Sequence, residues 1–237
     1  MAFWNKKKPQ RKPELSSRGA GSAVSKVDVG ALAPTAAEYL ASATNLQATL
    51  AGVLTRCATQ AWSSVDSRDV LNAAGHAMDR YRAFDNLLAD YVDDVPIALA
   101  PGREKLAAHV ARFQSDRWYE NLTTCYVLTG FTRDFWHLLA EGLPAALGSQ
   151  VQGILADHGD EDAMAEVIGK LLASDERYRS RVSLWSRRLV GDLMLVCRDA
   201  LSTSALASKD TGAPLEPVFT EVVAHHTRRL DRLGLTA

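Results

Sequence analysis

"PTAAEYLASATNLQATLAGV", residues 34–53, is the stretch that decides the fold class. Thr35 and Glu38 have the spacing of a capping box, in which each side chain accepts a hydrogen bond from an amide at the start of a new helix. Apolar residues then recur at intervals of three and four, at Leu40, Ala43, Leu46, Leu50 and Val53. This spacing predicts a long helix with one buried stripe.

The same helical period continues along the chain. It predicts further helices over about 69–91, 100–113, 115–143, 146–159, 160–173, 175–202 and 217–233. No segment alternates with the period of two that a strand needs, and no internal repeat is found. Because several of the predicted helices are long, the sequence predicts an all-α fold built as a long helical bundle.

The first residues have a different composition. Residues 1–26 contain seven basic side chains and one acid, a charge of +6 in a chain whose net charge is -1. Large apolar residues are rare there, which is typical of disorder. We expect a disordered basic arm over residues 1–33 and a helical domain over residues 34–237. The arm is either a solubilising tail or a contact for RNA, an anionic surface or an acidic protein. The residues for such contacts are Lys6, Lys7, Lys8, Arg11 and Lys12.

The cysteines and the apolar segments indicate in which compartment the protein is expected. Cys57, Cys125 and Cys197 form no CxxC pair, which argues against a zinc or redox motif. No apolar run approaches the roughly 20 residues that span a bilayer, and no signal-peptide core is present. We therefore expect a cytoplasmic protein with reduced thiols and no transmembrane segment.

"ILADHGDEDAM", residues 154–164, raises the question of a metal site, because it places four carboxylates and His158 in one short stretch. Carboxylate-bridged metal pairs in helical bundles use one Glu from each of two helices and a Glu-x-x-His from each of two others. This chain contains no Glu-x-x-His. Nucleotide-binding and zinc-protease motifs are absent as well. The stretch is therefore interpreted as the remnant of a metal site.

Four stretches carry a resemblance to a known family. They are "SLWSRRLVGDLMLVCRDAL" (183–201), "AHHTRRLDRLGL" (224–235), "RWYENLTTCYVLTGFTRDFW" (117–136) and "ILADHGDEDAMAEVI" (154–168). Together they resemble the actinobacterial ferritin-like proteins grouped with the tRNA hydroxylase of methylthio-isopentenyl-adenosine. From residue 34 onward, the resemblance implies a ferritin-like four-helix bundle with additional C-terminal helices. In members with a full ligand set it also implies a non-haem di-iron site that activates oxygen.

Most of the ligands that the resemblance implies are replaced in this chain. The six ligand positions fall on Gln47, Ala77, Arg80, Thr129, Asp157 and Asp160. Only Asp157 keeps a carboxylate of the expected kind, and Asp160 is a possible substitute for His. A guanidinium stays protonated and cannot bind a metal. We therefore predict that Arg80 pairs with Asp157 or Asp160 where the metals would lie.

Other local patterns are weaker. Asp134 with His137, and Glu221 with His225, each supply two ligands where a stable metal site needs three or four. Four histidines have no partner in the sequence pattern: His76, His109, His158 and His226. Four arginines are either a phosphate-facing surface for tRNA or structural ion-pair partners: Arg187, Arg188, Arg228 and Arg229.

Two classes of function follow. In the first, the bundle has lost its di-iron centre and needs no cofactor. It then acts as a non-catalytic interaction or scaffolding protein for an unidentified partner, and the basic arm serves as a tether. In the second, it is a metal-dependent hydroxylase of tRNA or another substrate. Iron or manganese would then be held by a rearranged set of Asp157, Asp160, His158 and Asp134 with His137.

Overall fold

The computed structural model describes residues 34–202 and 216–236, which form eight helices and no strand. The helices are α1 (Ala36–Thr59), α2 (Ser64–Ala89), α3 (Val95–Ala111), α4 (Trp118–Ala140), α5 (Ala145–Leu155), α6 (Gly159–Ser174), α7 (Glu176–Ser202) and α8 (Glu216–Arg232). The all-α prediction is confirmed. The predicted arm, residues 1–33, lies outside the described residues, and so do Lys6, Lys7, Lys8, Arg11 and Lys12.

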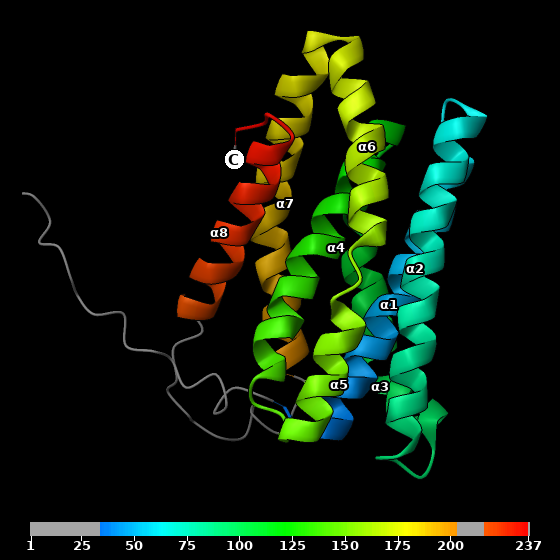
Figure 1. The fold of residues 1–237 in the computed structure, drawn as a ribbon, viewed down its shortest axis with the longest axis vertical. Helices are drawn as coiled ribbons and strands as arrows, with labels where there is room; N and C mark the ends of the chain where they lie inside the picture. The colour runs from blue at the N-terminus through cyan, green and yellow to red at the C-terminus, as the bar shows by residue number, and fades with distance from the viewer. Residues whose placement is uncertain (1–33, 203–215, 237) are drawn as a thin grey trace, which may run out of the picture.

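Four rods form the central bundle (Figure 1). α1 contacts α2 and α4, and α6 contacts the same two helices, so the four rods close into a ring. α5 and α6 follow one another along the fourth rod. α7 and α8 both pack on α4, and α3 packs mainly on α1. α4 is therefore the helix that joins the bundle to the additional C-terminal helices.

The first residues of α1, α2 and α3 are set by capping side chains. The capping box of α1 is present, with the Thr35 amide donating to Glu38 Oε2 at 3.0 Å and the Glu38 amide donating to Thr35 Oγ1 at 3.3 Å. α2 and α3 begin five residues earlier than predicted, at Ser64 and Val95. The reason is that a side chain before each helix accepts a first-turn amide: Ser63 caps α2 and Asp94 caps α3.

The core follows the predicted stripes. Leu40, Leu46 and Leu50 of α1 are at most 3 % exposed, whereas Val53 is only partly buried and Leu54 continues the stripe. On α4, Phe131 is fully buried. Free thiols at Cys57, Cys125 and Cys197 all lie buried in this core. Within the described residues, no helix is both long enough and apolar enough to cross a membrane.

A break in the fourth rod positions the site. α5 ends at Leu155 and α6 begins at Gly159, close to the predicted break. Asp157 lies in the connection, and Asp160 lies in the first turn of α6. The break is packed closely against α2, because a Cβ at Gly159 would overlap the His76 ring. The carboxylates of the predicted metal remnant are thereby placed halfway along the bundle.

Candidate functional site

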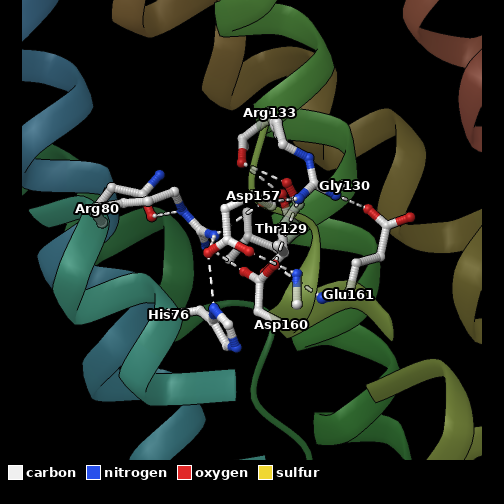
Figure 2. Close-up of polar contacts among 12 residues, drawn as sticks. His76, Arg80, Thr129, Gly130, Arg133, Asp157, Asp160 and Glu161 are labelled. Carbon is white, nitrogen blue, oxygen red and sulfur yellow. Dashed lines mark hydrogen bonds and ion pairs between the residues drawn. The ribbon is translucent and has the colours of Figure 1, made fainter. Parts of the chain in front are cut away.

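Asp157 and Asp160, two of the positions that the resemblance implies for metal ligands, meet inside the bundle around the side chain of Arg80 (Figure 2). Arg80 is 4 % exposed, and its Nε donates to Gln47 Oε1 at 3.0 Å. Its Nη2 binds Asp160 Oδ2, and its Nη1 lies 3.6 Å from Asp157 Oδ2. The prediction that Arg80 pairs with Asp157 or Asp160 is confirmed, and the guanidinium contacts both of them.

A second guanidinium, from Arg133 of α4, approaches the same aspartates from the other side (Figure 2). Its Nη1 donates to the Asp157 carbonyl at 3.0 Å and lies 3.5 Å from Asp160 Oδ1, while Nη2 binds Glu161. Sequence reasoning missed Arg133. The signal was its position four residues after Thr129, because residues at i and i+4 share a helix face.

A third guanidinium, from Arg229 of α8, extends the cluster outward. Its Nη2 binds Asp134 and donates to the Gly130 carbonyl at 3.0 Å, and its Nε lies 3.1 Å from Glu161 Oε1. Gly130 makes this approach possible, because a Cβ there would lie 2.5 Å from Arg229 Nε. Of the two interpretations for Arg229, the structural ion-pair partner is the one observed.

Together these side chains form one buried ion-pair network, a name used below for Arg80, Arg133, Arg229, Asp134, Asp157, Asp160 and Glu161. Positive and negative groups alternate along it from α2 to α8. Asp160 is fully buried, and a buried charge is costly unless it is paired and hydrogen-bonded. The two guanidiniums that contact Asp160 supply this compensation.

A histidine lies at each end of the network. His76 Nδ1 lies 2.7 Å from Asp157 Oδ2, and His225 Nδ1 lies 3.5 Å from Asp134 Oδ2. His76 therefore has a partner that the sequence pattern did not reveal. Desolvation favours a higher pKa for Asp157, but hydrogen bonds from the Gly159 amide and His76, with the charge of Arg80, bring the pKa below its ordinary value. Asp157 is thus held as a carboxylate.

The other candidate positions do not add metal ligands beside Asp157 and Asp160. Ala77 is fully buried, and Thr129 is buried with no hydrogen-bond partner for its hydroxyl among the described residues. His137 and His158 are exposed, as is Glu221. Arg187 binds Thr236, and Arg188 lies over the Trp185 ring. In the described part of the chain, no group of three or more His, Cys, Asp or Glu side chains is placed to hold a metal ion.

The comparison with protein families shows to which family this chain belongs. The family described as "Ferritin-like domain, actinomycetes" matches residues 39–209, more than half of the chain. The chain belongs to this family. A comparison with curated proteins found no match. The ferritin-like bundle that the resemblance implied is therefore confirmed, with α7 and α8 as the additional C-terminal helices.

The donor set of this ferritin-like domain does not fit a di-iron centre. Such a centre needs carboxylates and imidazoles from four helices, several of which bridge two cations. At the positions that the resemblance implies for ligands, Arg80 supplies a fixed positive charge, and Gln47, Ala77 and Thr129 supply neither a carboxylate nor an imidazole. Because Asp157 and Asp160 are both paired with guanidiniums, a dication would have to displace these guanidiniums against charge repulsion.

The buried His226 is expected to make the stability of the domain depend on pH. It lies on α8, 2 % exposed and beside Phe131, and neither ring nitrogen has a hydrogen-bond partner among the described residues. Burial and the charge of Arg229 lower its pKa to about 4, although Asp134 opposes the shift. The ordinary value is about 6.5, so on acidification the unfolded chain takes up this proton first. Stability is then lost as the pH falls from about 6.5 to about 4.

We expect His226→Phe to remove this pH dependence. Urea unfolding followed by circular dichroism at pH 7.5 and pH 5 would measure it. Wild-type protein should lose stability between the two values, and the variant should lose much less. An equal loss in both proteins would show that the dependence arises elsewhere. Asp157 does not account for it, because a lowered carboxyl pKa takes effect only below about pH 4.

Proposed function

We propose that this chain is a non-catalytic member of the ferritin-like proteins related to the tRNA hydroxylase, and that it acts as an interaction or scaffolding protein. The observation that carries the proposal is Arg80. Its guanidinium binds Asp160 and lies 3.6 Å from Asp157 Oδ2, so the two remaining carboxylates of the ligand pattern neutralise an arginine instead of a metal.

The rest of the bundle supports the same conclusion. Glu161 adds a second buried carboxylate beside Asp160, and it is bound by Arg133 and Arg229. The relation to the tRNA hydroxylase rests on the stretch at residues 183–201 and its three companions. The basic residues within 1–33 provide the proposed tether to a partner or an anionic surface.

The alternative, a hydroxylase with a rearranged ligand set, has less support. Asp134, Asp157 and Asp160 each contact an arginine of the buried ion-pair network. His137 and His158 are exposed on different elements. A metal held by these residues would require the arginines to leave their carboxylates.

Metal content is the measurement that tests the proposal. The full chain would be expressed in iron-supplemented medium, purified without a metal-affinity tag or chelator, and measured by mass spectrometry. We expect iron and manganese well below one atom per chain. About two atoms per chain, the content of a dinuclear site, would overturn the proposal and favour oxygen chemistry.

A matched variant sharpens this test. Asp157→Asn with Asp160→Asn removes the two remaining carboxylates of the ligand pattern. If the traces of metal in wild-type protein are adventitious, they stay the same in the double variant. A fall in metal content with the double substitution would locate a real metal at this level and contradict the proposal.

A further inference from the structure

We propose that an open cleft between α4, α8 and the α5–α6 connection binds a phosphate group, either free or carried by a small molecule. The cleft has a volume of about 660 Å³, which lies within the usual range of about 300–1,000 Å³ for small-molecule sites. It opens on the outer side of the buried ion-pair network. The inference goes beyond the proposed function and does not depend on whether a metal binds.

The cleft carries an excess of positive charge. It is lined by four arginines and two carboxylates, a net charge of +2 with its histidines neutral: Arg133, Arg228, Arg229 and Arg232 with Asp134 and Glu161. This contrasts with residues 27–237 as a whole, which carry a net charge of -7 in the sequence. A local concentration of cations on an acidic body attracts a compact anion.

The two arginines at the base are fixed and have unused donors. Arg229 is 4 % exposed, yet its Nη1 has no hydrogen-bond partner among the described residues. Arg133 is 5 % exposed, and its Nε has none among them either. These two nitrogen atoms have almost no exposed surface, so the arginines at the base act on an anion in the cleft through their positive charge and not through these donors.

The two arginines at the rim are available to a ligand. Arg228 is exposed and has no ion-pair partner in the part of the chain that the structure describes. The Arg232 side chain is 71 % exposed, and it lies 3.8 Å from Glu161, at the limit of an ion pair. They are four residues apart on α8, so they share one face and can contact one group together.

Three histidines complete the lining, and each comes from a different element. His137 is on α4, His158 precedes α6 and His225 is on α8. Imidazole N–H groups donate to anions as arginines do, and they add charge when protonated. The arginines and histidines therefore approach the cleft from three elements of the fold. This arrangement suits a tetrahedral anion with several acceptor oxygens.

The shape of the cleft favours a compact phosphate over an RNA strand. Leu155 and Ala156 form a short apolar wall that could contact the rest of a phosphorylated small molecule. Asp134 and Glu161 line the same cleft and are neutralised by Arg133 and Arg229, so the two rim arginines supply the excess charge, which is enough for one phosphate group and not for an extended run of phosphates. Nucleic acid binding relies on many neutralised phosphates along a surface, and residues 27–237 carry a net charge of -7 in the sequence, which opposes such binding.

Calorimetric titration of the full chain at constant ionic strength tests the proposal. The probes are inorganic phosphate, adenosine monophosphate and a short single-stranded RNA. The test variant is Arg228→Ala with Arg232→Ala. The control is Arg68→Ala with Arg82→Ala, which removes two equally exposed charges from α2 (74 % and 65 % side-chain exposure). Thermal unfolding would check that both variants remain folded.

We expect one saturable site per chain for inorganic phosphate or adenosine monophosphate. The test variant should weaken it about tenfold or more, because two charge-assisted hydrogen bonds are lost, and the control should leave it unchanged. Tighter binding of the monophosphate would assign a phosphorylated small molecule, and equal binding would assign free phosphate. Three outcomes would overturn the proposal: no saturable binding of either probe, equal weakening in both variants, or binding of the RNA alone.

Discussion

Arg80→Ala is expected to lower the free energy of unfolding by about 3–5 kcal/mol, the usual cost of removing one partner from a buried ion pair. Asp160 is fully buried, and Arg80 is one of the two guanidiniums that neutralise it. The substitution also leaves the Gln47 side chain without its donor. In a domain of this size the melting temperature should fall by roughly 6–20 °C.

Arg82→Ala is the matched control for this prediction. Arg82 is two residues away on α2, its side chain is 65 % exposed, and it pairs with an exposed Asp79. A surface pair of this kind contributes less than about 1 kcal/mol. Chemical denaturation of both variants measures the difference. If Arg80→Ala cost no more than Arg82→Ala, the ion pairs in the bundle would carry little of its stability.

Glu161→Gln should have an effect of similar size, about 3–5 kcal/mol. Glu161 is 6 % exposed, accepts a hydrogen bond from Arg133 and forms an ion pair with Arg229, and both arginines are themselves buried. Glutamine has nearly the same shape but no charge, and its amide would place a donor against a guanidinium. Two buried positive charges would then share the remaining carboxylates.

The control for Glu161→Gln lies on the same helix. Glu166 has a 68 % exposed side chain and pairs with Lys170 at 2.9 Å, so Glu166→Gln makes the same chemical change at the surface. Its cost should stay within about 0.5 kcal/mol. Urea unfolding curves at one pH compare the two variants. Equal costs would contradict the view that burial makes the Glu161 contacts strong.

The fold could be predicted because its signals are local. The Thr35 and Glu38 cap and the apolar period of α1 depend on residues three or four apart, and both are present as predicted. The pairing of Arg80 could be predicted because the resemblance implies that Arg80 and Asp160 both occupy ligand positions of one site, although they are eighty residues apart in the sequence. Where a cap other than a capping box begins a helix, as at Asp94, the predicted start was late.

The outer half of the site could not be predicted, because it depends on how α8 docks. Arg229 and Asp134 are 95 residues apart, and no local pattern joins them. The choice between a phosphate-facing and a structural role for Arg229 was therefore open in the sequence. The cleft has the same origin, since Arg228 and Arg232 meet α4 only through the packing of α8.

The buried ion-pair network also constrains the mutational paths open to this chain. Its charges are shared, so a substitution at one member changes the cost of a substitution at the next, and the effects are not additive. Arg80→His, for example, would restore a ligand type but weaken the neutralisation of Asp160. Gly130 adds a steric constraint. A Cβ there would clash with the Arg229 side chain, so a larger residue at position 130 requires a change at Arg229 as well. Single substitutions that introduce a metal ligand at Arg80 are therefore expected to destabilise the bundle unless a second substitution restores the balance of charge around Asp160.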